Sequence, residues 1–190
     1  MDKRIVRTKR LLRRSLLDLI SRESYDKITV TKICLNAGIG RGTFYTYYSD
    51  KNVLLVDCFK EMREATKAHF HQLQLSNNKA NDLMPAVINL IEALKTTSGR
   101  NSDKKNMLIA NGYIQSEYFR YVSDMMIYFE DLYSDVLTLR YDRDRLNAFI
   151  AMGVWGFMNI KSSGDEKDTM KTVMQLLQDL SESNLFVTKA

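Results

Sequence analysis

A short stretch between residues 29 and 51 gathers side chains that suit contact with a nucleic acid. Arg41 can donate two parallel hydrogen bonds to guanine, and threonine or tyrosine side chains can contact a thymine methyl group or a phosphate. Gly42 leaves the backbone open to close approach. The candidate DNA-contacting residues are Thr29, Thr31, Gly40, Arg41, Gly42, Thr43, Tyr45, Thr46, Tyr47 and Lys51. This set predicts recognition of a duplex through hydrogen bonds and ion pairs.

Two short helices joined by a tight turn would position these residues. Thr29 can cap a first helix, and Gly38 suits the left-handed residue that ends it. A second helix then opens at Gly40. Its Phe44 and Tyr48 lie four residues apart and face the core, which leaves the intervening side chains for a partner. This layout is that of a helix-turn-helix, whose second helix enters a duplex groove.

The sequence NAGIGRGTFYTYYSDKNVLL resembles the N-terminal DNA-binding domain of the TetR family of bacterial transcriptional regulators. The pattern of that family reads roughly A-G-V-S-x-G-T-[FLI]-Y-x-[HY]-F-x-[SD]-K-x-x-L. The resemblance extends from about Lys9 to Leu55. The matching positions are Ala37, Gly38, Gly42, Thr43, Phe44, Tyr45, Tyr47, Asp50, Lys51 and Leu54. It implies an all-α regulator that binds an operator as a homodimer.

Four positions depart from the family pattern. Gly40 stands where the family usually has Ser or Thr, a residue that caps the recognition helix and touches phosphate. Lys32 replaces a usual acidic residue, so Thr29 and Lys32 form no capping box. The other two departures are Ser24 and Tyr48. The resemblance implies that Arg41, Thr43, Tyr45 and Thr46 face base edges, whereas Tyr47, Lys51 and the basic first helix meet phosphates.

Positive charge is concentrated near the start of the chain. Residues 1–51 hold 12 Lys/Arg against 5 Asp/Glu, whereas residues 52–190 hold 16 against 18. The run of Lys3, Arg4, Arg7, Lys9, Arg10, Arg13 and Arg14 suits either a solvated helix face or a phosphate-binding one. Together with the helix-turn-helix, it favours DNA.

Scarce glycine, a single proline and apolar residues at helical spacing predict an all-α fold of about nine helices. We expect a DNA-binding domain over residues 1–50 and an effector-binding and dimerisation domain over residues 51–190. The first helix is expected from about residue 9. A rigid helix of about residues 50–75, capped by Asp50, would join the domains, and helices are expected over 84–94, 104–111, 113–139, 145–161 and 167–180.

The last two expected helices carry an apolar stripe that contains two glycines, and glycine lets helices approach closely. The stripe suits either the core of a monomer or a contact between two copies, and the resemblance implies the contact between copies. The expected dimer residues are Phe149, Gly153, Gly156, Ile160, Val173, Leu176, Leu177 and Leu180.

The middle of the chain is rich in aromatic and sulfur-containing side chains, which suit either an ordinary core or an adaptable apolar cavity. The resemblance implies a pocket for a small-molecule effector in this region. The candidate pocket residues are Tyr113, Tyr118, Tyr121, Met125, Tyr128, Phe129, Met152 and Trp155.

Other classes of protein find little support in the sequence. No nucleophile–base set, metal-ligand spacing or phosphate loop is present, so we expect neither an enzyme nor a cofactor or metal. No apolar run is long enough for a membrane span, and no signal sequence is evident, so we expect a cytoplasmic protein. Cys34 and Cys58 are expected as buried free thiols.

The resemblance therefore implies a ligand-responsive repressor that binds a pseudo-palindromic operator as a homodimer. The alternative is a TetR-like co-activator or architectural protein that acts mainly through protein contacts.

Overall fold

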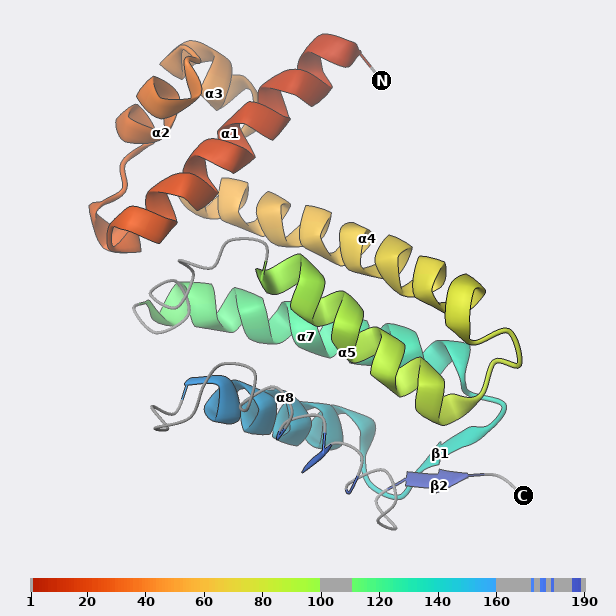
Figure 1. The fold of residues 1–190 in the computed structure, drawn as a ribbon. Coiled ribbons are helices and arrows are strands. Elements are labelled where there is room, and N and C mark those ends of the chain that lie inside the picture. Colours follow the sequence, from red (N-terminus) through yellow and green to blue (C-terminus); the bar gives the residue numbers. More distant parts are fainter. Residues whose placement is uncertain are drawn as a thin grey trace. The chain divides into compact units, whose positions relative to one another are not determined.

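The chain is mostly helical in the computed structural model, which describes residues 2–99, 111–159, 172, 175–176, 179 and 186–188 (Figure 1). The helices are α1 (Lys3–Arg22), η1 (Tyr25–Lys27), α2 (Val30–Ala37), α3 (Arg41–Tyr47), α4 (Lys51–Asn77), α5 (Leu83–Gly99), α7 (Gly112–Leu132) and α8 (Arg143–Asn159). These described ranges contain seven α-helices, so the predicted count of about nine is not confirmed. The helix expected over 104–111 lies outside the described residues, as does most of the one over 167–180.

Two short strands depart from the all-helical expectation. Strand β1 (Leu137–Leu139) pairs antiparallel with β2 (Phe186–Thr188), with Thr138 opposite Val187. The prediction of one helix over 113–139 was therefore wrong, because α7 ends at Leu132 and a turn bonded to the Tyr133 carbonyl follows. The apolar–polar–apolar sequence Leu-Thr-Leu has the period of a strand.

Capping side chains decide where several helices begin. Helix α1 starts at Lys3, earlier than predicted, because Asp2 Oδ1 accepts a hydrogen bond from the backbone N–H of Arg4 at 2.9 Å. Asp50 Oδ1 accepts from the N–H groups of Asn52 and Val53 at 2.7 and 3.0 Å. The prediction that Asp50 caps α4 is confirmed.

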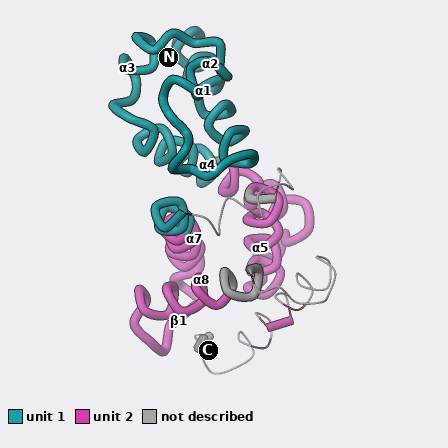
Figure 2. The backbone as a smooth tube through the Cα atoms, turned by 90° about the vertical axis from the view of Figure 1, so that its left-hand side faces the viewer, with its two compact units in different colours: residues 1–64, 98–118 teal, residues 65–97, 119–190 magenta. Residues whose placement is uncertain are grey.

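The chain forms two compact units (Figure 2). The first contains Met1–Glu64 and Ser98–Tyr118, and the second contains Ala65–Thr97 and Phe119–Ala190. Helix α4 contributes residues to both units. The first unit continues past residue 50 into the start of α4. The predicted division of function after residue 50, with DNA binding before it and effector binding and dimerisation after it, stays a prediction. We call the part of the first unit up to Glu64 the head.

The head has an apolar core formed by α1, α2, α3 and the start of α4. Its fully buried side chains come from all four helices: Leu12, Leu16, Ile33, Phe44, Leu54, Leu55 and Phe59 are each at most 1% exposed. The Ser15 hydroxyl donates to the Ile33 carbonyl at 2.8 Å and so joins α1 to α2 inside this core. The predicted burial of Phe44 and Tyr48 is confirmed.

A polar cluster ties α1, α4 and the end of α3 together. Asp57 Oδ2 accepts hydrogen bonds from the Tyr48 hydroxyl at 2.6 Å and from Arg13 Nη1 at 2.9 Å. The Arg13 guanidinium also pairs with Glu61. Burial alone would raise the pKa of Asp57, but the hydrogen bonds from Tyr48 and Arg13 outweigh burial and lower this pKa.

The second unit packs α4 against α7 through aromatic and hydroxyl groups. Phe70 meets Phe129 edge to face at 6.1 Å, and Phe129 stacks on Tyr133 at 4.7 Å. Thr66 and Tyr121 are both fully buried, and their hydroxyl groups lie 2.7 Å apart in a hydrogen bond.

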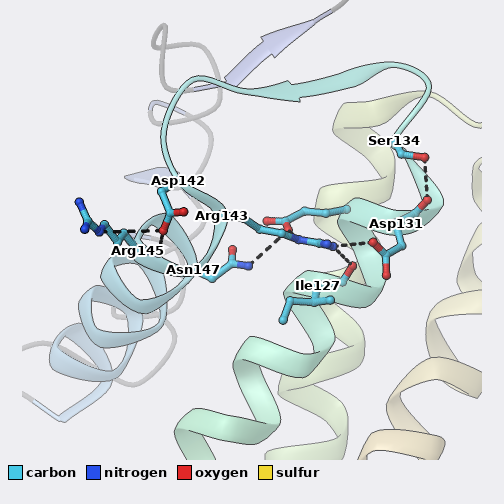
Figure 3. Close-up of polar contacts among 8 residues, drawn as sticks. Ile127, Asp131, Ser134, Asp142, Arg143, Arg145 and Asn147 are labelled. Carbon is cyan, nitrogen blue, oxygen red and sulfur yellow. Dashed lines mark hydrogen bonds and ion pairs between the residues drawn. The ribbon is translucent and has the colours of Figure 1, made fainter.

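Arg143, the first residue of α8, fixes this helix to α7 (Figure 3). Its Nε donates to Glu130 at 2.5 Å, and its Nη2 donates to Asp131 at 2.6 Å and to the Ile127 carbonyl at 2.7 Å. One turn later, Asn147 Nδ2 donates to the same Glu130 carboxylate at 3.3 Å. Arg143 and Asn147 therefore define the face of α8 that meets α7.

Both cysteines, Cys34 and Cys58, are buried free thiols, as predicted. Burial raises the pKa of each. Among the described residues, no helix combines the length and the apolarity that a bilayer crossing requires.

The lowered pKa of Asp57 predicts acid sensitivity of the first unit. Since the unfolded state binds the proton more tightly, the contribution of this carboxylate is fully present above about pH 4 and is lost as the pH falls through the folded-state pKa. Asp57→Asn should therefore reduce the loss of unfolding free energy below about pH 4. Urea denaturation at a series of pH values measures this loss. An identical pH dependence in wild type and variant would contradict the prediction.

Candidate nucleic-acid interface

Two helix caps set the geometry of the turn between α2 and α3. The Thr29 hydroxyl accepts from the backbone N–H of Lys32 at 3.2 Å, as expected for the cap of α2. Gly38 ends α2 with φ of 65°, a left-handed conformation that strongly favours glycine. Gly40 precedes α3 and provides no side-chain cap. The predicted capping roles of Thr29 and Gly38 are confirmed. The hydroxyl of Thr29 thus makes a hydrogen bond within the head.

Helix α3 presents its predicted contact residues to the outside. Arg41, Gly42, Thr43 and Thr46 are exposed, and Tyr45 is 50% exposed, while Phe44 is completely buried. The Tyr45 ring meets the Phe44 ring edge to face at 5.4 Å. The Arg41 guanidinium lies 6.0 Å from the centre of the Tyr45 ring, a cation–π contact that places both side chains on one face. The Thr46 hydroxyl donates to the Gly42 carbonyl at 3.1 Å.

Gly42 has no internal reason to be glycine. A Cβ atom added there would meet no atom of the described residues within 4 Å, and the residue sits in an ordinary helical conformation. An exposed glycine within a helix costs about 0.5–1 kcal/mol relative to alanine. The bare backbone at this position is therefore better explained by an external partner than by the packing of the head.

Tyr47 lies where α1 meets α3. The Lys9 ammonium is 5.8 Å from the centre of the Tyr47 ring and 5.6 Å from that of Tyr48. Tyr48 is buried, and Tyr47 is only partly covered. Lys9 thus directs its charge to the aromatic end of α3 and leaves the face of Arg41 and Tyr45 uncovered.

Lys51 lies in the first turn of α4, as predicted, and its side chain makes contacts inside the head. Its ammonium donates to the carbonyls of Tyr25 and Ile28 at 2.7 and 2.9 Å and lies 4.4 Å from the centre of the Tyr25 ring. These contacts hold the start of α4 on the turn between η1 and α2. Lys51 therefore positions the helix-turn-helix, and its contact with a phosphate stays a prediction.

The Tyr25 ring is held on several sides. Its hydroxyl donates to Asn52 Oδ1 at 2.7 Å, and its ring stacks on Tyr113 at 6.5 Å. Burial and the neighbouring Tyr113 raise the pKa of Tyr25. Beside this stack, Asn111 Nδ2 donates to Asp26 at 2.8 Å. The start of α7 is thus joined to the η1 turn within the first unit.

Residues 14–58 match the model of the family described as bacterial regulatory proteins, tetR family. The match covers α2, α3, the turn between them and the beginning of α4. The head of this chain is a TetR-family domain. The uncharacterized HTH-type transcriptional regulator YxbF of Bacillus subtilis strain 168 is 38% identical over 56 residues. That alignment covers 29% of this chain and only 15% of YxbF.

Solved structures extend the likeness of fold beyond the TetR-family head. A putative TetR-family transcriptional regulator from Syntrophomonas wolfei has a TM-score of 0.66 and 14% identity, with 94% of this chain and 96% of that one covered. Thermus thermophilus FadR, a TetR-family repressor solved with lauroyl-CoA, has a TM-score of 0.61 and 16% identity, with 96% and 97% covered. At these identities the likeness shows that the fold is shared.

The predicted effector residues do not form one continuous set. Tyr113 and Tyr118 belong to the first unit, together with the TetR-family head, whereas the remaining residues belong to the second. Tyr121 and Met125 are fully buried in internal packing, and Tyr128 bonds His71 Nε2 at 2.5 Å. Met152 is 54% exposed, and the side chain of Trp155 lies outside the described residues. The effector pocket stays a prediction.

The predicted dimer residues of α8 that the structure describes are accessible. Phe149 is 64% exposed, and a Cβ at Gly153 would meet no atom of the described residues within 4 Å. Leu176 is half-buried. The exposure of Gly156 is not described, and Ile160, Val173, Leu177 and Leu180 lie outside the described residues.

Sequence reasoning missed the residues that orient α3. Asp57 was not singled out, and Arg13 was counted only as part of a basic run, although the two bind each other beneath Tyr48. A signal was present, since Arg13 lies three residues before the buried Leu16 and so at the edge of the apolar face of α1. Thr31 is exposed on α2, as the prediction requires.

Lys51→Ala should destabilise the TetR-family head. Hydrogen bonds from a charged donor contribute about 1.5–3 kcal/mol, so loss of the two carbonyl contacts should lower the unfolding free energy by about 1–3 kcal/mol. Lys60→Ala, an exposed lysine of the same helix, is the matched control and should change little. Urea denaturation followed by circular dichroism compares the two. Unchanged stability for Lys51→Ala would contradict this positioning role and would favour the predicted contact with a phosphate.

Proposed function

We propose that this chain is a DNA-binding transcriptional regulator that recognises its operator through α3. The observation that carries the proposal is the division of α3 into two faces. Phe44 is completely buried. Gly42 and Thr46 lie on the opposite side of the helix, and they are exposed together with Arg41, Thr43 and Tyr45. A helix-turn-helix uses such a geometry to bring the second helix into the major groove.

The exposed residues of α3 suit distinct contacts. Arg41 can bind guanine O6 and N7, and Thr43 and Tyr45 can contact a thymine methyl group or a base edge. Thr46 retains its methyl group and its acceptor lone pairs after donating to the Gly42 carbonyl. Tyr47, Thr31 and Thr29 are at least partly exposed and suit phosphates, which position a protein without specifying sequence.

Gly40 reduces the number of contacts at the start of α3. It caps the helix by backbone geometry alone, with φ of −66° and ψ of 145°. A Cβ atom at this position would meet no atom of the described residues within 4 Å. A serine would therefore fit there and would add a hydroxyl to the cap and to the phosphate-facing surface. Recognition in this chain depends more on Arg41 and the residues after it.

We further propose that the regulator acts as a homodimer through α8. Arg143 and Asn147 face α7, whereas Phe149, Met152 and Gly153 lie on the opposite, open face of the same helix. The side chains of Phe149 and Met152 are 64% and 54% exposed, and adjacent exposed apolar side chains of this size often mark a protein–protein contact. A two-fold pair would present two copies of α3 to a pseudo-palindromic operator.

We also propose that an effector controls DNA binding. The solved complex of Thermus thermophilus FadR with lauroyl-CoA supports a ligand site in this fold. Helix α4 is continuous from Lys51 to Asn77 and contributes to both units. A displacement of its second half would therefore disturb the hydrogen bonds of Lys51 to the Tyr25 and Ile28 carbonyls. Release of DNA then requires that the effector bind the two states of the protein with different affinity.

The function is tested by selecting duplexes from a random pool and repeating the measurement with Arg41→Ala. The substitution should cost on the order of 1–3 kcal/mol at one base position and relax the preference there, because a bidentate arginine–guanine pair is lost. Arg140→Ala removes an exposed charge of the second unit that lies before α8, and it serves as control. Absence of any preferred sequence for the wild type would overturn the proposal and favour action through protein contacts.

The proposed dimer is tested by Phe149→Asp. A charge on this exposed apolar face should convert the dimer into a monomer, because the carboxylate would be buried without a partner. Leu75→Asp, at a 78% exposed position of α4, is the matched control and should remain dimeric. Sedimentation velocity distinguishes the two states. A dimeric Phe149→Asp, or a monomeric wild type, would contradict the assignment.

A further inference from the structure

Two side chains at the start of α7 contact the η1 turn, which precedes the helix-turn-helix in the chain. Asn111 Nδ2 donates a hydrogen bond to Asp26 Oδ1 at 2.8 Å, across 85 positions of sequence. The Tyr113 ring stacks on the Tyr25 ring, with centres 6.5 Å apart and planes 14° from parallel. We call Asn111 and Tyr113 the α7 brace.

The cap of α7 fixes the orientation of the Asn111 side chain. Its Oδ1 accepts from the backbone N–H groups of Tyr113 at 2.9 Å and of Ile114 at 3.4 Å, as a helix N-cap does. Because the amide oxygen is occupied in this way, the amide nitrogen is directed away from the helix and is the donor to Asp26. Ile114 is 1% exposed, so the first turn of α7 is anchored in the first unit.

The tyrosine that receives the α7 brace is itself held firmly. Tyr25 is 3% exposed, its hydroxyl donates to Asn52 Oδ1 at 2.7 Å, and the Lys51 ammonium lies 4.4 Å from its ring centre. Lys51 also donates to the carbonyl of Ile28, the residue before the cap of α2. The α7 brace therefore bears on the segment from which α2 begins.

Helices α4 and α7 both contribute residues to the two units (Figure 2). Each of them also contacts the same ring in the head, since α4 reaches Tyr25 through Lys51 and Asn52, and α7 reaches it through Tyr113. A head attached to one helix can turn about that attachment, whereas a second attachment fixes its direction. The α7 brace supplies this second attachment.

We propose that Asn111 and Tyr113 are positioning residues for operator binding: they fix the direction of the head on α7 and thereby set the separation of the two α3 helices in the dimer. The inference rests on the proposed function, because it takes the operator and the homodimer as given. The position of α3 inside the head has separate support, from the burial of Phe44 and the hydrogen bond of Tyr48 to Asp57. Loss of the α7 brace should therefore affect the spacing of two copies of α3 and leave a single copy competent.

The substitutions separate the contact with Asp26 from the cap of α7. Asn111→Asp keeps an oxygen for the cap, but it replaces the donor by a carboxylate that faces the carboxylate of Asp26. Asp26→Asn keeps an acceptor for Asn111 and is the matched control. The double variant Asn111→Asp/Asp26→Asn again pairs one donor with one acceptor, in the reverse direction.

A second pair of variants tests the stacked ring. Tyr113→Ala removes the ring that lies on Tyr25, and aromatic pairs of this kind contribute beyond the area that they bury. Tyr141→Ala removes a 53% exposed ring of the second unit and is the control. Circular dichroism confirms that all variants of the full chain are folded.

Affinity is measured for two duplexes selected by the wild type, one with both half-sites and one with a single half-site. Asn111→Asp and Tyr113→Ala should bind the two-half-site duplex on the order of fivefold more weakly, because a less firmly directed head adopts the required spacing for a smaller fraction of the time. Their affinity for the single half-site should stay within about twofold of the wild type. Both controls and the double variant should match the wild type on both duplexes.

Equal losses on the two duplexes would show that the α7 brace only supports the fold of the head, which overturns the inference. A double variant as weak as Asn111→Asp, or brace variants that bind like the wild type, would overturn it as well. Failure of the proposed function gives a different result, which appears in the wild type alone. A wild type that selects no sequence, or that binds both duplexes equally, would overturn the proposed operator or dimer and the inference with it.

Discussion

The burial of one face of α3 is the constraint on which the rest of the head depends. Phe44 is completely buried in the head, and Tyr48 is held by its hydrogen bond to Asp57, which in turn binds Arg13 of α1. Truncation of a buried phenylalanine typically costs about 3–5 kcal/mol, a large part of the stability of a small domain. A seven-residue helix is too short to be stable alone, so this anchoring gives α3 both its existence and its direction.

Because the inner face of α3 is fixed in the core, the exposed side chains of this helix are available to a partner. Arg41 and Tyr45 contact each other, and the Tyr45 ring also meets Phe44 edge to face at 5.4 Å. Gly42 has open space in place of a side chain. The other cations near the motif are used differently. Lys51 binds two carbonyls, and Lys9 covers tyrosine rings, so both hold the motif together. Base recognition and scaffold support are thus assigned to separate residues.

Local patterns predicted the parts of the head that depend on local physics. The four-residue spacing of Phe44 and Tyr48 predicted the buried face, and the glycine after α2 predicted the left-handed turn. The role of Lys51 was not predictable in this way, because its partners lie 23 and 26 residues away in sequence and a long side chain reaches them only after folding. The same holds for β1, since three residues form a strand only when a distant partner pairs with them. Periodicity predicted the apolar stripe of α8 but did not decide between a monomer core and a contact between copies. It likewise did not separate the candidate effector residues from ordinary core.

The most direct test of the central claim is the substitution Gly42→Ala, measured for both stability and DNA affinity. If the bare backbone of α3 serves an external partner, alanine should raise the unfolding free energy by about 0.5–1 kcal/mol, because the helix gains a better former and no clash arises. The same variant should bind a wild-type-selected duplex more weakly, because the new methyl group stands between the helix and the groove. Opposite signs in the two measurements would support the account. An alanine variant that is more stable and binds the duplex as well as the wild type would contradict it.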